Sequence, residues 1–452
     1  MKRDRWIELL LLLVLWAVLA WRGFPFPNVD DGLFTGAALN LATGGGLRNP
    51  LLEASGPYYL YPPFYDYFLA GWLRIAGTGF AAMAGFHLAV CFATSALLLE
   101  IFRKWNRDEW GWVGVLLYVD YIAYFGLRSD ALGLLFIVLS VRLGLTASRP
   151  CAGVAPFFAL LGMATHPPLL ALAVPWVFWL AWTKPPARIG VVAGVVGVGV
   201  LFLVLIGGDL FGFIQGFLKN AAESRLKNTR WLLGEWFRAQ NIFKIVLLPV
   251  FSLVLAVRKM KCRGAAASDV AFLLALSFGF YAMLGSLTGN RLLGLISVLG
   301  VLGYLTAWPN PGKKGRMAIW IALAIFCASI GRPLVEGLVM EKPSGAEMQQ
   351  IRSDLKKVAY DHLVVDWWSL RYVFDFRPPA NTVYLLSSRR PRDGYALLFP
   401  GECGLISVEA TDEYGLLDPG LPRPVYWRIA GRPVGRWIIN ASEIALITKT
   451  AP

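Results

Sequence analysis

The chain has 452 residues, of which 57% are hydrophobic and only 16% are charged. Soluble globular chains carry about 25% charged residues, and apolar runs long enough to cross a hydrocarbon core of about 30 Å recur along most of this sequence. These two features exclude a water-soluble fold. The net charge of +14 would indicate nucleic-acid binding in a soluble protein. Here, however, Lys and Arg cluster in short loops between apolar runs, as the positive-inside rule expects.

The amino-terminal segment is predicted to be the first membrane helix. Lys2, Arg3 and Arg5 precede an apolar run over residues 6–21, which gives the segment the outline of a signal peptide. No small-residue cleavage site follows this run, so we expect the helix to be retained.

Eleven apolar runs are predicted to cross the membrane as helices. They lie near residues 6–23, 80–102, 110–126, 129–146, 153–166, 168–183, 188–208, 241–257, 268–287, 291–308 and 317–335. A further candidate, residues 61–77, is short and carries Asp66 and Arg74, each costing about 2.5–3.5 kcal/mol at mid-membrane. Its apolar residues recur at helical spacing between Pro62 and Gly77, which is typical of a helix lying in the interface.

The distribution of basic residues supports this interpretation of residues 61–77. If the segment lies flat, the short basic loops all fall on one side of the membrane, as the positive-inside rule expects. These loops are at residues 2–5, 103–107, 149, 184–188, 258–263 and 313–316. We therefore predict an all-α polytopic protein of the plasma (inner) membrane with a cytoplasmic N-terminus. Residues 1–335 would form its transmembrane domain and residues 336–452 an extracytoplasmic domain.

Two adjacent acids, Asp30 and Asp31, lie in the predicted first outer loop. The residues after them read as a short amphipathic helix ended by Gly44–Gly46, with Asp30 as N-cap and Asp31 in the first turn. The pair can therefore be a helix cap alone. Alternatively, one carboxylate projects into a cavity as a general base and its neighbour supports it, because repulsion between vicinal acids can raise one pKa.

Further polar residues of the predicted outer face are candidates for substrate binding. Arg128 and Asp130 lie where one span ends and the next begins, so they either anchor helix ends or hold an anionic group. His166 precedes two prolines and is either an ordinary loop histidine or a residue that binds phosphate or polarises a hydroxyl.

The long fourth outer loop, residues 209–240, is basic on a side where short loops are not. Its pattern predicts an interfacial basic helix that recognises phosphate, of bulk lipid or of a specific lipid substrate. The basic residues concerned are Arg225, Lys227 and Arg230. Arg291, at the outer end of a later span, is either another phosphate contact or a snorkelling anchor.

The C-terminal tail is the part with ordinary soluble composition. A helix is predicted at 344–360, and strands are predicted at 362–365, 382–387, 396–399, 405–409, 425–429, 437–440 and 444–449. This pattern favours a small α/β or α+β domain. Such a domain either holds an acceptor or caps the outer cavity.

The order of these motifs over about residues 1–310 resembles the glycosyltransferase C superfamily (GT-C). Val29-Asp30-Asp31-Gly32 is similar to that family's Asp-Glu or Asp-Asp pair, and Tyr61-Pro-Pro-Phe-Tyr65 to its Pro-Pro-Leu-Tyr pattern. Arg128-Ser129-Asp130 resembles its Arg-Pro-Asp/Glu step, with Ser in place of Pro, and Thr165-His166 falls where a basic residue often opens a span. The likeness is to the bacterial branch around protein O-mannosyltransferases, the lipid A aminoarabinose transferase and the rhizobial core transferases.

The resemblance implies a membrane enzyme that moves a sugar from a polyprenyl-phosphate donor to an extracytoplasmic acceptor: a lipid, a glycan or a protein. It implies an inverting hexosyl- or pentosyltransferase in which Asp30 is the base, Asp31 supports it, and Tyr61 and Tyr65 line the acceptor side. The leaving phosphate would be stabilised by Arg291 together with Arg225, Lys227 or Arg230. No cofactor is expected, and without a visible third or fourth clustered oxygen ligand we expect no required divalent metal.

Other classes of membrane protein remain as alternatives. A secondary transporter would need polar groups near mid-bilayer and internal repeats, whereas here His87 is a lone polar residue within a span and reads as a packed polar group. A lipid-linked glycan ligase and a membrane scaffold with a docking tail are further possibilities. The position of the polar residues, at the outer surface or at mid-membrane, distinguishes transferase from transporter.

Overall fold

The computed structural model describes residues 2–218, apart from 29, 53–56, 105–107, 124–125 and 147. In the C-terminal third it describes residues 362–365, 369–384 and four later strands, with isolated residues between 317 and 356. Several predicted elements lie outside these residues. Three are the predicted spans at 241–257, 268–287 and 291–308, and a fourth is the predicted strand at 405–409. Most of the predicted span at 317–335 and most of the predicted helix at 344–360 also lie outside them.

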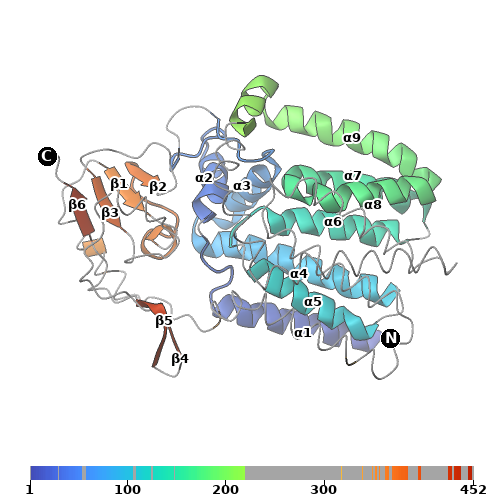
Figure 1. The fold of residues 1–452 in the computed structure, drawn as a ribbon, viewed down its shortest axis with the longest axis horizontal. Helices are drawn as coiled ribbons and strands as arrows, with labels where there is room; N and C mark the ends of the chain where they lie inside the picture. The colour runs from blue at the N-terminus through green and yellow to red at the C-terminus, as the bar shows by residue number, and fades with distance from the viewer. Residues whose placement is uncertain are drawn as a thin grey trace.

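The described part of the N-terminal half is a bundle of helices that run side by side (Figure 1). The bundle consists of α1 (Lys2–Trp21), α4 (Phe80–Lys104), α5 (Asp108–Ala123), α6 (Asp130–Gly144), α7 (Arg149–Thr165), α8 (Leu170–Thr183) and α9 (Pro185–Leu205). A single 3₁₀ turn, η1 (Pro167–Leu169), joins α7 to α8. Each helix coincides with one of the first seven predicted spans to within a few residues.

Two of the described helices, α4 and α9, have the length and apolar composition of a membrane-spanning helix. Both bury part of their surface against neighbours and leave the rest to the surroundings. On α9 the exposed side chains include Ile189, Val192 and Val204, each more than half exposed. Because lipid is as apolar as these side chains, such a surface is stable in a bilayer.

Two short helices, α2 (Asp31–Ala42) and α3 (Phe64–Ala76), lie at one end of the bundle (Figure 1). Helix α3 begins after Pro62–Pro63 and ends at Gly77, whose φ of +94° suits a residue without a side chain. With about 1.5 Å of rise per residue, its 13 residues are too short to cross a bilayer. Its apolar side chains Phe68, Trp72 and Ile75 are exposed, as an interfacial helix requires.

Glycines bring the bundle helices into close contact. A Cβ on Gly190 of α9 would lie 1.8 Å from the carbonyl oxygen of Gly153 on α7, and one on Gly162 of α7 would lie 2.7 Å from that of Gly133 on α6. Helices in membranes pack through such small residues because the backbones can then approach closely.

Ion pairs join the helices at the end of the bundle that carries the N-terminus, opposite α2 and α3 (Figure 1). Glu100 of α4 binds Arg5 of α1 and Arg142 of α6, and Arg103 of α4 binds Glu8 of α1. These residues belong to the basic loops and helix ends that are predicted to face the cytoplasm.

The described strands of the C-terminal part form a four-stranded sheet of order β2-β1-β3-β6 and a two-stranded sheet of β4 and β5. Their bounds are β1 (His362–Val365), β2 (Thr382–Tyr384), β3 (Tyr395–Leu398), β4 (Tyr426–Ile429), β5 (Arg432–Ile438) and β6 (Leu446–Lys449). Strand β1 pairs in parallel with β2 and β3, and β6 is antiparallel to β3. Strand β1 has the predicted bounds, whereas β5 begins five residues before the predicted strand at 437–440.

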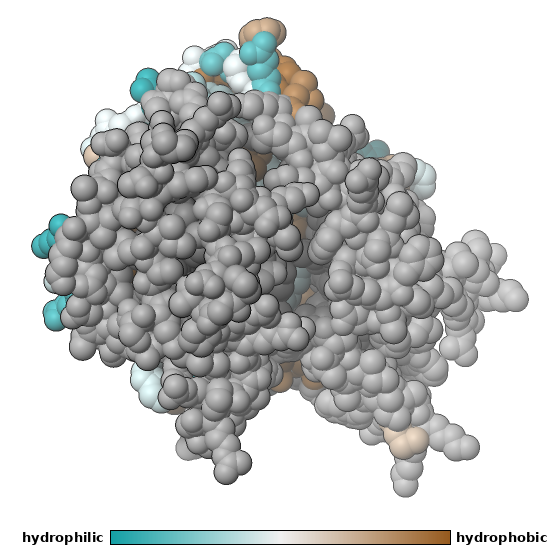
Figure 2. Space-filling model, turned by 60° about the vertical axis from the view of Figure 1, so that its left-hand side comes forward, coloured by the Kyte–Doolittle hydropathy of each residue, from teal (hydrophilic) through white to brown (hydrophobic). Residues whose placement is uncertain are grey.

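The helix that begins after α9 is mostly apolar in its described part, up to residue 218. Leu210, Phe211, Ile214 and Leu218 are exposed apolar residues there, and Tyr59 contacts Phe213 at a ring-centroid distance of 5.3 Å. In the space-filling view, brown apolar and teal hydrophilic residues lie next to each other at the top of the molecule (Figure 2). A helix is thus present at the start of the predicted interfacial segment, and the basic residues of that prediction lie outside the described residues.

Candidate functional site

The acidic pair lies at the start of α2, where Asn28 binds the backbone of both acids. The backbone N–H of Asp31 donates to the carbonyl of Asn28 (2.9 Å), and the N–H of Asp30 donates to the Asn28 side-chain oxygen (3.0 Å). Asn favours such turns because its side chain hydrogen-bonds the backbone two residues on. Asp30 is the N-cap residue of α2 as predicted, but its side chain makes no capping hydrogen bond.

The Asp31 carboxylate is fully buried and bound by the backbone on both sides. Its Oδ2 accepts the N–H of Asn28 (3.1 Å), and its Oδ1 accepts the N–H of Leu127 (2.9 Å). Burial raises the pKa of Asp31 to about 7, although these two N–H groups and the nearby Arg371 guanidinium lower it; repulsion from Asp30 is a lesser cause. Asp31 thus joins the first outer loop to the loop that carries Arg128.

Asp30, in contrast, reaches a network of charged side chains at the N-terminal end of α6. Arg128 pairs with Asp30, and its Nε donates to Asp130 Oδ2 (2.9 Å). The other oxygen of Asp130 lies 3.1 Å from His166 Nε2. Four residues from three segments of the sequence, each predicted as a site residue on its own, therefore form one connected cluster.

The cluster is well enclosed, and its central cation is held firmly in the charged state. The side chain of Arg128 is 10% exposed and that of Asp30 is 19% exposed. Burial alone lowers the pKa of Arg128, but the charges of Asp130 and Asp30 outweigh it and raise that pKa above its usual value. The cluster thus holds one guanidinium between two carboxylates, of which Asp30 is the more exposed.

His166 is oriented by two partners. Its Nδ1 lies 2.9 Å from Ser129 Oγ, while Nε2 faces Asp130. A histidine bound at both ring nitrogens has a fixed orientation and tautomer. Ser129, which replaces the Pro of the family pattern, therefore supplies a hydrogen bond that proline cannot make.

Aromatic rings cover the cluster on the side of α2 and α3. The Arg128 guanidinium lies 5.0 Å from the ring centroid of Phe34. The ring of Tyr61 packs edge-on against His166 at 5.0 Å and contacts Phe34 at 5.6 Å. The Tyr65 hydroxyl donates to the carbonyl of Leu127 (2.9 Å). These rings exclude water, which strengthens the ion pairs.

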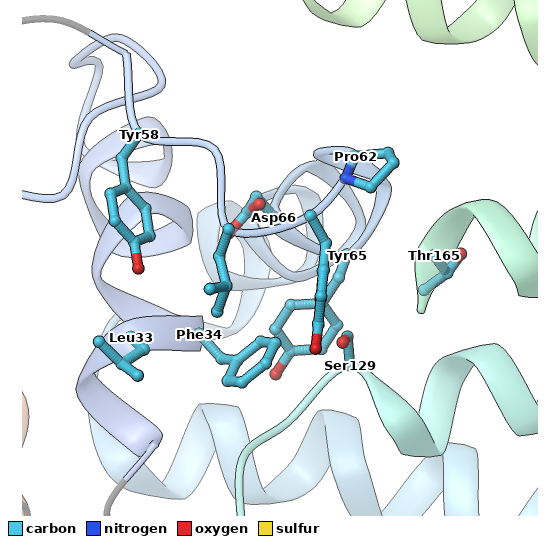
Figure 3. A pocket seen from close by; sticks show the side chains of 10 residues that line it. Leu33, Phe34, Tyr58, Pro62, Tyr65, Asp66, Ser129 and Thr165 are labelled. Carbon is cyan, nitrogen blue, oxygen red and sulfur yellow. The ribbon is translucent and has the colours of Figure 1, made fainter. Parts of the chain in front are cut away.

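A pocket opens beside the cluster, and side chains from four segments converge on it (Figure 3). Helix α2 contributes Leu33 and Phe34, the start of α3 contributes Tyr65 and Asp66, and Ser129 and Thr165 line the opposite wall. Burial raises the pKa of Asp66 to about 8, so that at neutral pH its carboxyl group holds a proton and can donate a hydrogen bond. The lining thus combines aromatic faces with hydrogen-bonding groups.

Seven of the eleven predicted site residues are brought to this one region. They are Asp30, Asp31, Tyr61, Tyr65, Arg128, Asp130 and His166. The four predicted phosphate ligands Arg225, Lys227, Arg230 and Arg291 lie outside the described residues. His87, read as a packed polar residue, lies behind the cluster, with Nε2 3.1 Å from the carbonyl oxygen of Arg128.

Sequence reasoning missed three contributors to this region. Phe34 stands four residues after Asp30, a helical spacing that was a usable signal, and Asp66 directly follows Tyr65 of a recognised motif. Arg371 lies in the C-terminal part, more than 300 residues from the loop whose carbonyls it binds, and no local pattern marks it. Within the described residues, no group of three or more His, Cys, Asp or Glu side chains is placed to hold a metal ion.

Comparisons with known proteins give a likeness among solved structures and none among sequences. No protein-family model matches the sequence, and no curated protein matches it. Among solved structures, the chain is similar to the oligosaccharyltransferase of Archaeoglobus fulgidus, crystallised in complex with Zn and sulfate, at 12% identity and a TM-score of 0.43. The match covers 83% of this chain and 62% of that chain. At these values the likeness assigns neither a family nor an activity.

Proposed function

We propose that the protein is a membrane glycosyltransferase that moves a sugar from a polyprenyl-phosphate donor to an extracytoplasmic acceptor. The observation that carries the proposal is the cluster of Asp30, Arg128, Asp130 and His166 beside an aromatic pocket, at one end of an apolar helix bundle. A donor with a long polyprenyl tail needs a site at the membrane surface, and transfer needs a carboxylate base near a bound hydroxyl.

The ion pair between Asp30 and Arg128 supports the proposed topology. Between these residues the chain passes through α4 and α5, which run along the bundle, and through α2 and α3 at its end. The two side chains meet on one side of the membrane if α4 and α5 both cross it and α3 does not. This agrees with an interfacial α3, a cytoplasmic N-terminus and an outward-facing site in a protein of about eleven spans.

In the proposed reaction, Asp30 accepts the proton of the acceptor hydroxyl while the hydroxyl oxygen attacks the anomeric carbon of the donor sugar. The bond from that carbon to the phosphate oxygen breaks, its electron pair leaves with the polyprenyl phosphate, and direct displacement inverts the anomeric centre. Asp31, enclosed by backbone N–H groups, fixes the position of its neighbour. Arg128 and the basic residues at 225, 227, 230 and 291 are proposed to stabilise the phosphate.

A secondary transporter is the competing proposal, and the described charges argue against it. Transport requires charged groups near mid-bilayer, whereas the described ion pairs gather at the two ends of the bundle. A lipid-linked glycan ligase would use the same site with a larger donor, so a panel of donors is needed to separate the two transferases.

The test is sugar transfer by the purified protein in lipid nanodiscs, with a panel of polyprenyl-phosphate sugars and mass analysis of the products. Asp30→Asn removes the base and should lower the rate by about 10²–10⁴-fold. The matched control Asp209→Asn changes an exposed acid outside the cluster and should keep the wild-type rate. Chelation with EDTA should leave transfer unchanged, since no metal is proposed.

Two outcomes would overturn the proposal at different levels. Near-wild-type transfer by Asp30→Asn would remove this residue as the base and leave the transferase assignment intact. Absence of transfer from every donor, with envelope glycans unchanged in cells that lack the protein, would reject a glycosyltransferase and favour transport.

A further inference from the structure

A segment of the C-terminal part, residues 369–384, packs directly against the loop and helices that carry the acidic pair. We call it the docking segment. It begins with a π-helical turn, Ser369–Val373, and ends with strand β2. In Figure 1 the strands lie next to α2, beyond the end of the bundle. Four side chains of the docking segment make the contacts described below: Arg371, Asp375, Phe376 and Tyr384.

Arg371 binds the chain just before the acidic pair. Its Nη2 donates to the carbonyl of Gly23 (2.5 Å) and its Nη1 to the carbonyl of Pro25. The guanidinium carbon lies 3.7 Å from the ring centroid of Phe80, and Arg371 is only 4% exposed. Burying a guanidinium costs free energy unless its N–H groups are hydrogen-bonded and its positive charge lies near a negative one. The two carbonyls accept hydrogen bonds from the two terminal nitrogens, and the carboxylate of Asp31 is a nearby opposite charge, whereas the buried Nε has no hydrogen-bond partner among the described residues.

Asp375 binds the first residue of α4. Its Oδ1 accepts the backbone N–H of Phe80 (2.7 Å), which places a carboxylate at the positive end of a long helix. Asp375 and Phe376 have φ values of +50° and +59°, a conformation that costs free energy for residues with a side chain. Phe376 stacks on Phe80 at a centroid distance of 6.3 Å, so the turn is held in place by contacts with α4.

Tyr384 binds α2 and the loop after it. Its backbone N–H donates to the carbonyl of Leu51 (2.8 Å). Its ring covers Gly32, the residue after Asp31, so closely that a Cβ at Gly32 would lie 2.7 Å from the ring. The docking segment thus contacts the chain before the acidic pair, directly after it, and at the neighbouring helix α4.

We propose that Arg371 is a positioning residue for the acidic pair: by bridging the carbonyls of Gly23 and Pro25 it fixes the loop that presents Asp30. The C-terminal part then completes the catalytic site without contacting substrate. This inference rests on the proposed function for its effect on catalysis, whereas its effect on the loop does not depend on the reaction.

The first test measures the loop itself, by backbone hydrogen exchange of the full-length protein in nanodiscs. Arg371→Ala should increase exchange in peptides that cover residues 23–34 and Leu127, while peptides from α7 exchange as in the wild type. Arg371→Lys keeps the charge and one donor and should restore part of the protection. The matched control Arg377→Ala removes an exposed arginine of the same turn and should change neither region.

The second test measures transfer against pH, with rates normalised to folded protein. The groups facing Asp31 are Asp30 beside it, Tyr65 of α3, and Arg371 and Tyr372 of the docking segment. Arg371→Ala removes a charge that lowers the Asp31 pKa. Because the ionised Asp31 binds the N–H groups of Asn28 and Leu127 and so positions Asp30, the acid limb of the rate profile should then move to higher pH. The rate at the optimum should fall about tenfold or more, with the donor KM little changed. Arg371→Lys should keep the acid limb near its wild-type position.

The outcomes separate the two proposals. If no variant or wild-type protein transfers sugar, the proposed function fails, and hydrogen exchange alone still decides the role of Arg371. Wild-type exchange of residues 23–34 in Arg371→Ala would overturn the positioning role. A drop in rate without a shift of the acid limb would reduce Arg371 to a general stabilising contact. If Arg371→Ala does not fold, hydrogen exchange is measured in Arg371→Lys and Asp375→Asn instead. Both variants should then show increased exchange at residues 23–34. Wild-type exchange in both would overturn the proposal.

Discussion

The two adjacent acids differ in environment although they are neighbours in sequence. Asp31 is enclosed by two backbone N–H groups, and Asp30 pairs with Arg128 in the charged cluster. The pair therefore divides into one acid that holds two loops together and one that belongs to the charged cluster. The sequence reading expected repulsion between the acids to raise a pKa; in the structure the raised pKa belongs to Asp31, and burial is the main cause.

The titration of Asp31 predicts how stability depends on pH. Its pKa rises from 3.8 to about 7 on folding, so the folded protein keeps a proton that the unfolded chain releases between these values. The stability contributed by this proton is fully present below the unfolded pKa and is lost as pH rises through the folded pKa. Asp31→Asn cannot ionise and should flatten the dependence of apparent melting temperature on pH between about 4 and 7.

The control for this measurement is Asp209→Asn, an exposed acid that should keep the wild-type dependence. Equal slopes in Asp31→Asn and the wild type would show that another group sets the pH dependence.

Gly126 is required where the second loop meets Asp31. Its φ is +54°, and a Cβ there would lie 2.4 Å from Asp31 Oδ1 and 2.6 Å from Asn28 Cβ. Gly126→Ala should therefore break the hydrogen bond from the Leu127 N–H to Asp31 and reduce the rate of sugar transfer about tenfold or more. Gly44→Ala is the matched control, because Gly44 also has a positive φ (+91°) but nothing within 4 Å of its Cβ position. It should lose only stability, about 1–2 kcal/mol.

At this scale the sequence predicted the identities of the site residues better than their partners. Asp30, Arg128, Asp130 and His166 were each marked by residue type and by position next to a span. Their pairing depends on how α6 and α7 pack, which no local pattern encodes. Arg371 and Tyr384 were not predicted at all, because long-range contacts leave no periodic signal.

At the scale of elements, hydrophobic periodicity was a sufficient guide to the helices. Helix α3 was predicted from Pro62, Gly77 and an apolar stripe between them, and the structure confirms a helix over Phe64–Ala76. Helix lengths follow from long apolar runs, so the first seven predicted spans are all helical. Strand bounds were less predictable: β5 begins at Arg432, in a segment with Pro433 and Gly435, which lower strand propensity.

The contact between α7 and α9 gives a prediction for one element. Gly190 faces the carbonyl of Gly153 with no room for a side chain, whereas Gly199 of the same helix has nothing within 4 Å. Gly190→Ala should force the helices apart and lower stability by about 1–3 kcal/mol, measured as apparent melting temperature in detergent. Gly199→Ala, in the same helix, should leave the melting temperature unchanged or raise it slightly. Equal behaviour of the two variants would contradict close packing at Gly190.

At the scale of the whole molecule, the orientation of the bundle can be tested at one natural cysteine. Cys151 lies in the first turn of α7 and is partly exposed, at the predicted cytoplasmic end. In a variant that retains only this cysteine, a membrane-impermeant maleimide should label it in permeabilised cells and not in intact cells. If α3 crossed the membrane, Cys151 would face outward and react in both.

Gly46→Cys in a background without other cysteines is the positive control. Gly46 lies in the loop after α2 and has open space around it, and it should react in intact cells. Residue 46 lies on the outer side whether or not α3 crosses the membrane. Its labelling therefore shows only that the maleimide reaches the outer face, and the labelling of Cys151 decides whether α3 crosses.

The contact of Arg371 with Gly23 and Pro25 has a consequence for biosynthesis. Arg371 follows Pro25 by 346 residues along the chain, so at about 5–20 residues per second the ribosome reaches it roughly 20–70 s later. During that interval the loop before Asp30 is already outside the membrane under the proposed topology, but without the guanidinium that binds its carbonyls. The first outer loop can therefore take its final form only when nearly the whole chain has been made and translocated. A stalled or truncated product would carry the acidic pair on a loop that is not yet fixed.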